Sequence, residues 1–548
     1  MAARRRAPWL HPDDTPEHFR RLGVWGDLNL AEIFDAAAGR NPDKVAVVDS
    51  TSRVSYRQLR DRSLSYAAVL DNLGVGAGDP VAAQLPGCAD LPALHLACVR
   101  LGAVFMPVSP TWRAAELRPL LATVAAPVLV AAGDNQSFDL VGLARSLRDE
   151  LPTLRHVVPT MVDGADSLDS MAALAGPLTL DKQVSSRPDP DAPAHAMCSS
   201  GTTASPKVSV LSSNDLVALL IRHFGPRLCL TNEDVAAGLA PAGTGSTGYI
   251  FPVLAPLLIG ASTAVLERWT PRGALDLIVR ERATYATAIP TQMVMLLGED
   301  LEGADLTRFT RFNNAGAPLS AVVARELEMR MGCRVQTVYG ATDGGVPVMT
   351  SVDDPDEVRH TTVGAVCPGV EVRLLNSDSS SAPDGGSGEI CWRGPSKSYG
   401  YLNQPDYDAA AFDSDGFFHS GDVGRFDPDG NLRIVGRIKD MILRGGTNIF
   451  PAEVENLLGR HASVAGVAVV GVADARLGER ACAVVVPAPG PPPTLDQLCA
   501  HLLEHELARV KLPEELVLID SLPTNAGGKV DKNALRDHVA KELAGRRG

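Results

Sequence analysis

Four short segments of the chain carry residues that could bind a phosphate, a sugar and a metal ion. The first is Ser199-Ser-Gly-Thr-Thr-Ala-Ser-Pro-Lys-Val208, which directly follows the apolar run Ala194–Cys198. Backbone N–H groups and hydroxyls in such a turn donate to phosphate oxygens, and Lys207 adds positive charge. The segment lacks the Gly-Lys-Ser/Thr of a Walker loop. Taken alone, such a turn is more often an ordinary surface loop.

The second segment is Val338-Tyr-Gly-Ala-Thr-Asp-Gly-Gly345. Its pattern predicts a strand that ends in a tight turn, at the kind of sheet edge where open α/β sheets bind ligands. There Tyr339 could stack on a base, Thr342 could bond a phosphate and Asp343 could hold Mg²⁺. The alternative is a turn in which the aspartate only caps the next element.

The third and fourth segments each carry one or two charged groups. In Ser420-Gly-Asp422 and Gly436-Arg437, the carboxylate can accept both hydroxyls of a ribose and the guanidinium can bind ribose or phosphate. In Asn525-Ala-Gly-Gly-Lys529, the glycines could bring the lysine into a cleft as an electrostatic catalyst. Charged residues in hairpins and loops are more often solvated surface groups.

The elements before these segments alternate between strand and helix patterns. Apolar β-rich runs predict strands, and helical spacing with Gly74 as a stop predicts helices. The strands are Lys44–Asp49, Pro80–Leu85 and Pro127–Ala131, and the helices are Tyr56–Leu73 and Leu94–Leu101. The alternation resumes between Asp191 and Thr342, so we expect two layers of parallel sheet covered by helices.

The pattern changes after the glycine-rich stretch Gly436–Gly446. A compact segment follows, for which we predict helices over Pro451–Leu458 and Leu495–Val510 and strands over Val467–Val472, Ala481–Val486 and Glu515–Ile519. We therefore predict an α/β fold with a large N-terminal domain of helix-sandwiched sheets, residues 1–439, and a small mobile α+β C-terminal domain, residues 440–548.

Composition excludes several classes of protein. The 548 residues carry a formal charge of −14, which disfavours a nucleic-acid-binding surface. The nine cysteines form no C-x-x-C pair and no Cys/His group with zinc-ligand spacing, so we expect a reduced chain.

No targeting or membrane segment is predicted. The basic start Met-Ala-Ala-Arg-Arg-Arg is followed by polar residues rather than the apolar run of a signal peptide. The most apolar stretch, Tyr249–Leu266, is interrupted by Pro252, Pro256 and Gly260, which indicates a buried helix that leads into a core strand. A soluble cytoplasmic protein is expected.

Taken together and in this order, the four segments resemble the ANL superfamily: acyl- and aryl-CoA ligases, adenylation domains of nonribosomal peptide synthetases, and luciferases. The resemblance extends from the Lys44 strand to Lys529. It includes Asn314-Ala-Gly-Ala-Pro318 as the adenine-side segment, and Gly388-Glu389, Gly394 and Gly478-Glu479 as further markers.

The resemblance implies a two-step reaction with ATP, Mg²⁺ and coenzyme A. A carboxylic acid becomes its acyl-adenylate, and the CoA thiol then displaces AMP. Lys529, Thr342 and Asp343 are the implied catalytic residues, and Asp343 is the implied metal ligand. The implied nucleotide-binding residues are Ser199, Ser200, Gly201, Thr202, Thr203, Lys207, Gly316, Ala317, Pro318, Tyr339, Gly340, Ala341, Thr342, Asp422 and Arg437.

The resemblance also implies that the small domain swings between the two steps. Asp440 stands at the hinge position, and Gly445 and Gly446 would line the CoA tunnel. The run Gly445–Glu455 looks more like CoA ligases than peptide-synthetase domains, so CoA is the expected acceptor.

The acid pocket is expected along Ala240–Tyr249, which is nearly all small. With Gly316 and Gly340, the implied substrate-binding residues there are Gly243, Gly245 and Tyr249. Small walls leave volume, so we expect a bulky alicyclic, polycyclic or aryl acid. Phe19–Trp25 also looks like ligases of such acids.

Three residues depart from the superfamily pattern. Ala204 and Val208 replace glycines of the phosphate loop, where positive φ or close approach to phosphate favours glycine. Asp343 replaces a longer glutamate. One hypothesis is that adenylation is impaired, so that a partner enzyme supplies the adenylate. The other is that the loop tolerates these substitutions.

Alternative functions stay open at this point. They are a ligase that loads an acyl-carrier protein, a stand-alone adenylation enzyme, a luciferase-like oxygenase, and a non-catalytic adenylate-binding pseudoenzyme. The oligomeric state cannot be read from the sequence, and a homodimer is one possibility.

Overall fold

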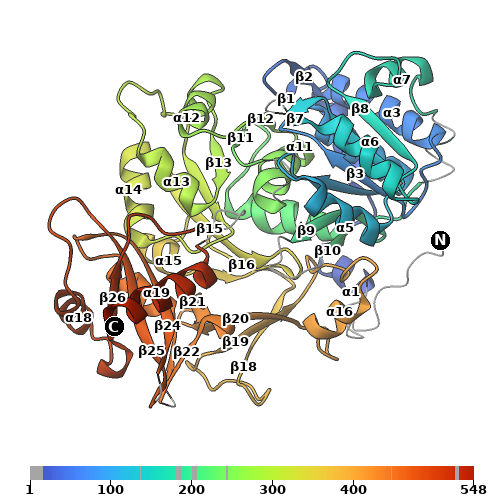
Figure 1. Cartoon of the computed structure of the whole chain (residues 1–548). Coiled ribbons are helices and arrows are strands. Elements are labelled where there is room, and N and C mark those ends of the chain that lie inside the picture. The colour runs from blue at the N-terminus through green and yellow to red at the C-terminus, as the bar shows by residue number, and fades with distance from the viewer. Residues whose placement is uncertain are drawn as a thin grey trace.

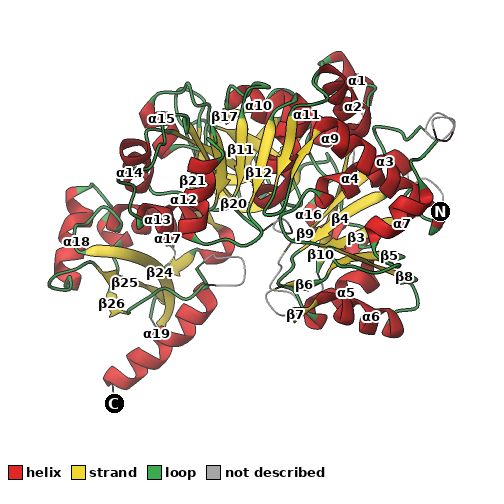
Figure 2. Ribbon diagram, turned by 90° about the horizontal axis from the view of Figure 1, so that it is seen from above, coloured by secondary structure: helices red, strands yellow, loops and turns green. Residues whose placement is uncertain are grey.

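The computed structural model of the protein describes residues 16–135, 138–179, 182, 187–199, 206–241, 243, 245–445, 447–474, 476–524 and 530–547. It has a large N-terminal domain of sheets and helices and a smaller C-terminal domain, as expected (Figure 1). Helices lie on both sides of the strands in the large domain (Figure 2). Within the described ranges, every helix is too short or too polar to cross a lipid bilayer.

A nine-stranded sheet forms one layer of the large domain. Its six central strands run parallel to one another: β1, β11, β12, β13, β14 and β15. At the two edges, β2, β16 and β17 pair antiparallel with their neighbours. In spatial order they are β17 (Ala365–Val366), β16 (Gly345–Met349), β15 (Arg334–Ala341), β14 (Arg311–Ala315), β13 (Tyr285–Ala288), β11 (Val235–Gly238), β12 (Ser262–Val265), β1 (Val45–Val48) and β2 (Arg53–Ser55).

A six-stranded sheet forms the second layer. Its strands are β10 (Lys207–Ser212), β9 (Pro193–Ser199), β4 (Val104–Val108), β3 (Pro80–Gln84), β5 (Val128–Ala132) and β8 (His156–Thr160), and all but β10 run parallel to their neighbours. The two predicted parallel layers are therefore confirmed. The strand patterns were readable because parallel strands are buried on both faces and are nearly continuous apolar runs.

Helices of the large domain begin and end at the residues that capping chemistry favours. Helix α3 (Tyr56–Asn72) starts after Ser55, whose side chain accepts from the Gln58 N–H while the Gln58 side chain accepts from the Ser55 N–H. The chain turns just beyond it at Gly74, where φ is +76°. Helix α4 (Asp90–Leu101) begins four residues earlier than the predicted Leu94, because Pro92 is tolerated in a first turn.

The other helical segments are α1 (Pro16–Arg21), α2 (Leu30–Arg40), α5 (Ala114–Val124), α6 (Leu140–Glu150), α7 (Leu168–Ala175), α9 (Ser213–Val217), η1 (Ala218–Phe224), α10 (Gly225–Arg227), η2 (Ser246–Leu254), α11 (Ala255–Ile259), α12 (Pro271–Arg280), α13 (Pro290–Leu297), α14 (Ala321–Met331), α15 (Asp356–Thr361) and α16 (Pro405–Ala411). Both η1 and η2 are π-helical, a form that is rare and frequent near functional sites. The stretch from η2 through α11 into β12 confirms the expected buried helix and core strand.

A four-stranded antiparallel sheet completes the large domain, and the sequence predicted only its last hairpin. Its strands are β18 (Glu371–Leu375), β19 (Gly388–Arg393), β20 (Phe418–Phe426) and β21 (Leu432–Arg437). Trp392, Phe412 and Phe418 pack into its buried side.

The C-terminal domain is built on a five-stranded sheet of β22 (Ile442–Arg444), β23 (Thr447–Ile449), β24 (Val464–Asp474), β25 (Gly478–Pro487) and β26 (Glu515–Leu518), with helices α17 (Pro451–Leu458), α18 (Leu495–Glu504) and α19 (Lys532–Arg547). The prediction that α18 reaches Val510 is wrong. The helix ends at Glu504 because Glu506 adopts a positive φ of 62°, which a continuing right-handed helix cannot contain.

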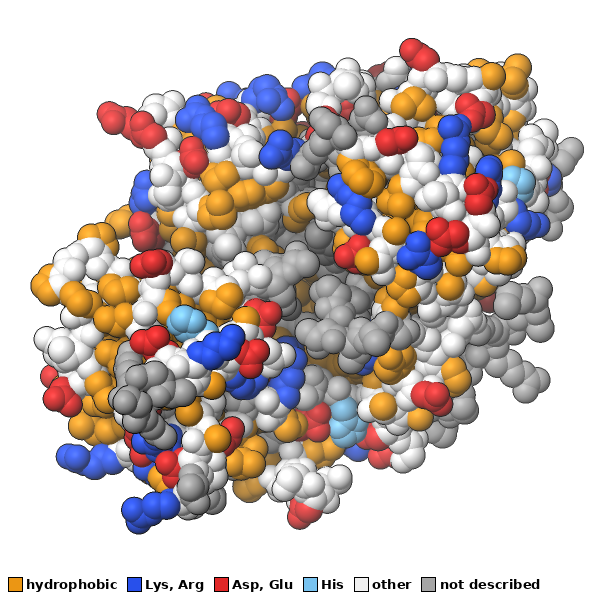
Figure 3. Space-filling model, in the orientation of Figure 1, with side chains coloured by type: hydrophobic (Ala, Val, Ile, Leu, Met, Phe, Trp, Pro, Cys, Tyr) orange, Lys and Arg blue, Asp and Glu red, His pale blue; other side chains and the backbone are white. Residues whose placement is uncertain are grey.

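Basic and acidic side chains are interspersed on the face shown in Figure 3. Among the described side chains visible in that view, no large patch of a single charge is formed.

Candidate functional site

The turn between β15 and β16 is as tight as its glycines predict. A Cβ added to Gly340 would lie 2.4 Å from the carbonyl oxygen of Gly345, and Gly345 itself has a φ of +78°. Both positions therefore require glycine. The turn presents Thr342 and Asp343 at the end of β15, beyond the carboxyl edge of the parallel strands.

Asp343 is half-buried at this turn and is held by a tyrosine. Its Oδ2 accepts a hydrogen bond of 2.6 Å from the Tyr401 hydroxyl. Burial raises the pKa of Asp343, an effect that the Tyr401 hydrogen bond and the charge of Lys207 oppose. Oδ1 is the oxygen that a metal ion would take without displacing Tyr401.

Lys207 lies over the ring of Tyr401, whose hydroxyl bonds to Asp343. Its Nζ is 5.4 Å from the centroid of the Tyr401 ring and 4.8 Å from that of Tyr407, which is cation–π geometry. The next residues of β10 are tied to the same turn, because the Ser209 hydroxyl donates to the carbonyl oxygen of Thr342 at 2.9 Å. The strand that leaves the expected phosphate loop therefore contacts the expected metal-side turn.

Val208 is accommodated without backbone strain. It lies in extended backbone within β10, its side chain is buried, and its N–H donates to Gln404 Oε1 at 3.1 Å. We expected a positive φ at this position, which a β-branched residue would oppose. That expectation is wrong, because Val208 lies in an extended strand, the conformation that valine favours. Ala204, the other departure in the loop, lies outside the described residues.

Asp422 contacts both Tyr339, which lies near the C-terminal end of β15, and Arg437. The Tyr339 hydroxyl donates to Asp422 Oδ2 at 2.9 Å, and Arg437 Nε donates to Asp422 Oδ1 at 2.6 Å. Asp422 and Arg437 are cross-strand partners on β20 and β21. Burial and the neighbouring carboxylate raise the pKa of Tyr339. Both carboxylate oxygens thus already hold donors, as they would hold two ribose hydroxyls.

The adenine-side segment leaves the neighbouring strand at the same edge. Ala315 pairs with Val338 in the parallel β14–β15 register, and Gly316 follows with a φ of +88°. The Asn314 side-chain amide donates to the carbonyl oxygen of Ala317 at 3.3 Å. The turn through Ala317 and Pro318 therefore lies beside the strand that ends in Tyr339.

The expected acid-pocket segment divides into an edge part and a buried part. Gly243 lies against the end of β4, where an added Cβ would be 2.2 Å from the Ser109 nitrogen. Gly245, with a φ of +64°, faces the sulfur of Met197 on β9. Tyr249 is completely buried, and its hydroxyl is 3.0 Å from His95 Nδ1. Tyr249 thus belongs to the core behind the two glycines.

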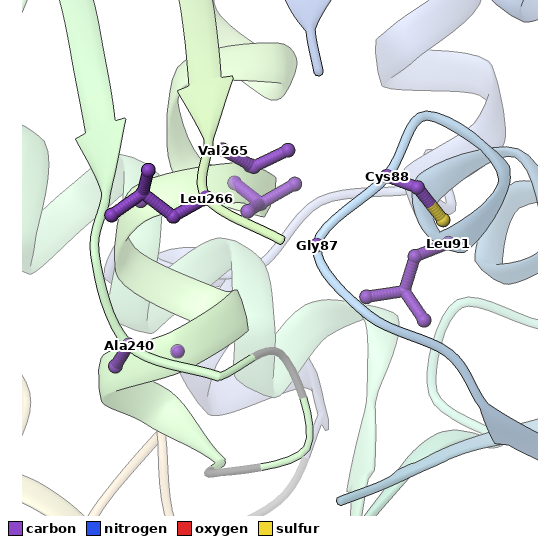
Figure 4. Close-up of a pocket in the computed structure, with 9 residues that line it drawn as sticks. Gly87, Cys88, Leu91, Ala240, Val265 and Leu266 are labelled. Carbon is purple, nitrogen blue, oxygen red and sulfur yellow. The ribbon is translucent and has the colours of Figure 1, made fainter. Parts of the chain in front are cut away.

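A small apolar pocket lies beside this segment. Figure 4 shows the loop of Gly87 and Cys88, with Leu91 of α4, on one side, and Val265 and Leu266 opposite. The pocket is lined by Gly87, Cys88, Leu91, Gly238, Ala240, Gly248, Val253, Val265 and Leu266. This lining suits a hydrocarbon group rather than a charged one.

Several predicted residues cannot be placed. Ser200, Gly201, Thr202, Thr203, Gly446 and Lys529 lie outside the described residues, and for Ser199 only the backbone at the end of β9 is described. Gly445 is placed, with a φ of +54° and its N–H 2.7 Å from the carbonyl oxygen of Leu477. Asp440 ends a short 3₁₀ turn after β21 and faces Arg536 of α19 at 3.6 Å.

Sequence reasoning missed the residues of segment 401–407, which contact β10 and the turn that contains Asp343. Tyr401, Gln404 and Tyr407 contact Asp343, Val208 and Lys207. The available signal was the tyrosine-rich run Tyr399–Tyr407 in a chain with only 5% aromatic residues.

The chain is similar to known proteins over most of its length. Residues 34–402 match the AMP-binding enzyme family, and residues 453–529 match the AMP-binding enzyme C-terminal domain. A medium-chain fatty-acid–CoA ligase of Escherichia coli (strain K12) is 34% identical over 530 residues, or 96% of this chain and 93% of the relative. A 2-hydroxy-7-methoxy-5-methyl-1-naphthoate–CoA ligase of Streptomyces carzinostaticus is 35% identical over 541 residues, or 96% of each chain.

A solved structure agrees with these matches. ATP-bound MatB from Rhodopseudomonas palustris superimposes with a TM-score of 0.81 at 29% identity, covering 93% of this chain and 99% of that chain. The similarity therefore spans both domains.

Proposed function

Since the chain belongs to the AMP-binding enzyme family, we propose that it is an acid–thiol ligase that makes an acyl-CoA through an acyl-adenylate. The observation that carries this proposal is the run of contacts along one strand edge. Lys207, in the strand after the phosphate loop, contacts Tyr401, and Tyr401 bonds to Asp343 at the metal-side turn. On the strand that leads into this turn, Tyr339 bonds to Asp422, which also binds Arg437.

The proposed reaction has two displacements. A carboxylate oxygen of the acid attacks the α-phosphorus of ATP. The bond between the α-phosphorus and the oxygen that bridges it to the β-phosphorus breaks, and pyrophosphate leaves. The CoA thiol then attacks the acyl carbon, loses its proton and displaces AMP. A Mg²⁺ ion held by Asp343 would neutralise phosphate charge when bound.

This chain's residues would position the nucleotide through groups that are already oriented. Asp422 would exchange its bonds from Tyr339 and Arg437 for ribose hydroxyls, and the freed guanidinium could turn to a phosphate. Lys207 would supply charge to the phosphates, and Lys529 would stabilise the adenylation transition state. Asp440 would be the hinge at the boundary between residues 1–439 and 440–548.

The proposed acid is bulky and largely apolar. Space beside Gly245, where an added Cβ would meet only the Met197 sulfur at 3.9 Å, supports the bulk, whereas Gly243 adds no space because it packs against the end of β4. The apolar lining of the small pocket beside Ala240 supports the apolar character. CoA is the proposed acceptor, with a carrier-protein phosphopantetheine as the alternative that the assay distinguishes.

A second candidate function is thioesterification of an adenylate that another enzyme supplies. The environment of Asp343 favours this candidate. Its short side chain is half-buried and hydrogen-bonded to Tyr401, and burial raises its pKa. Such a carboxylate binds a metal ion less readily than an exposed glutamate. The absence of strain at Val208 removes one of the original arguments for this candidate.

The test is a mass-spectrometric assay for acyl-CoA over a panel of bulky acids. Each acyl group is supplied as free acid with ATP, Mg²⁺ and CoA, or as preformed adenylate with CoA, and both reactions are repeated with a phosphopantetheinylated carrier protein in place of CoA. Product from both supports the complete ligase, and product from the adenylate alone supports the second candidate. Product only on a carrier protein, or none at all, rejects CoA ligation.

A pair of lysine variants sharpens the assay. Lys529→Ala should abolish product from the free acid while retaining product from the adenylate. The control is Lys532→Ala, which removes a lysine three positions on, one that pairs with Glu455 at 2.7 Å. Equal loss of ATP-dependent product in both variants would contradict the role given to Lys529.

A further inference from the structure

Three side chains able to bind a metal ion lie together on the four-stranded sheet, apart from the contacts described so far. Glu389 and Cys391 are alternate residues of β19, so they share one face of the strand. His419 lies on β20 directly opposite Cys391. Their ligand atoms all lie within 4.8 Å of one another. Sequence spacing does not indicate this group, because pairing between β19 and β20 assembles it.

Two of the three donor pairs, both of which include His419, have a spacing close to that of a tetrahedral zinc site. The third pair, Glu389 and Cys391, lies within 4.8 Å. His419 Nδ1 lies 3.1 Å from Glu389 Oε2 and 3.4 Å from Cys391 Sγ. With Zn–N and Zn–O bonds of about 2.1 Å and a Zn–S bond of about 2.3 Å, tetrahedral geometry places these pairs about 3.4 Å and about 3.6 Å apart. Each pair therefore needs to open by only about 0.3 Å or less.

Neighbouring groups orient the donors. The Gly421 N–H donates to Glu389 Oε1 at 2.9 Å, which leaves Oε2 facing His419. On the other ring nitrogen, His419 Nε2 lies 3.5 Å from Asp413 Oδ2. A carboxylate on the distal nitrogen is the usual support of a metal-bound histidine.

The site is accessible from one side and closed on the other. The His419 and Glu389 side chains are 30% and 20% exposed, whereas Cys391 is buried. Arg373 of β18 is the cross-strand partner of Cys391, but its guanidinium lies 3.2 Å from Glu371 and 3.3 Å from Asp415. An ion can therefore enter past the imidazole and meet the sulfur at the base.

We propose that Glu389, Cys391 and His419 bind a zinc ion, with water as the fourth ligand. Thiolate, imidazole and carboxylate together suit Zn²⁺ better than Mg²⁺ or Ca²⁺. Binding releases the thiol proton of Cys391 and any proton on His419 Nδ1. The ion joins β19 to β20 directly before Asp422, so it stabilises the hairpin that carries this carboxylate.

The test uses the reduced, chelator-treated full-length protein, titrated with Co²⁺ and then Zn²⁺. One equivalent of Co²⁺ should produce thiolate-to-metal absorption in the near ultraviolet, Zn²⁺ should remove it, and Zn²⁺ should raise the thermal midpoint. Cys391→Ser should abolish the absorption and weaken Zn²⁺ binding at least about a hundredfold, as judged by competition with a chromogenic chelator.

Cys229→Ser is the matched control. Cys229 is exposed, and its sulfur lies 3.3 Å from Asp353 Oδ2, so it is the competing place for surface binding. The control should leave absorption and affinity unchanged. If Cys391→Ser does not fold, His419→Gln gives the same comparison with the thiol retained. No absorption in the wild type, its persistence in Cys391→Ser or its loss in Cys229→Ser would overturn the proposal.

Discussion

Three buried histidines should make the large domain sensitive to mild acid. Burial lowers the pKa of His195 to about 3 and that of His223 to about 4, and it lowers the pKa of His95 well below its usual value. The folded protein keeps these imidazoles neutral, whereas the unfolded chain protonates them as the pH falls through about 6.5. Because the unfolded state then binds more protons, the free energy of unfolding falls as the pH drops from 7.

The size of the effect follows for His195 alone. With a pKa of about 3 in the folded state and about 6.5 in the unfolded state, linkage removes about 2 kcal/mol of stability between pH 7 and pH 5. Asp90 and Asp343, whose pKa values are raised, titrate in the opposite sense. A single-site comparison is therefore needed.

The comparison is wild type against His195→Leu, by urea unfolding at both pH values. All five tryptophans precede residue 440, so tryptophan fluorescence follows the large domain. The variant should lose about 2 kcal/mol less than wild type on acidification. Phe105→Leu is the control, since it removes a ring 6.0 Å from His195 but no titrating group. An equal pH dependence in wild type and His195→Leu would refute the reasoning.

Three further variants probe the site. Gly340→Ala should destabilise the large domain by roughly 2–4 kcal/mol in urea unfolding, because its Cβ would press on the Gly345 carbonyl; an unchanged midpoint would contradict this. Asp422→Asn should weaken AMP binding by about tenfold or more in calorimetry, through loss of the charged acceptor, and unchanged affinity would count against the ribose assignment. Asp343→Glu should speed ATP-dependent pyrophosphate release by about tenfold if the short, half-buried carboxylate limits metal binding; an unchanged or slower rate would contradict this.

Local signals made much of the fold predictable. The Ser55–Gln58 capping box and Gly74 bound α3 closely, and α17 has the predicted limits Pro451–Leu458. Buried parallel strands such as β3 were readable as apolar runs. By contrast, the end of α18 depends on the positive φ of Glu506, and nothing in the residue type indicates that conformation.

The candidate site was predictable as a set of segments but not as a geometry. Glycines at 340 and 345 marked the turn, because close approach and positive φ demand them. That Tyr339 bonds Asp422, or that Tyr401 takes an oxygen of Asp343, depends on pairing between distant segments. The Val208 error arose because a family pattern was read as a local backbone requirement, whereas this chain continues β10 through that residue.

The central claim is that the acyl group passes through an adenylate, and oxygen transfer from the acid tests it most directly. A bulky carboxylic acid labelled with ¹⁸O in both oxygens is incubated with the protein, ATP, Mg²⁺ and CoA, and the products are analysed by mass spectrometry. The account predicts acyl-CoA together with AMP that carries one ¹⁸O atom, because the carboxylate oxygen that attacks the α-phosphorus leaves with AMP. Acyl-CoA formed with the label in inorganic phosphate, or with unlabelled AMP, would contradict it.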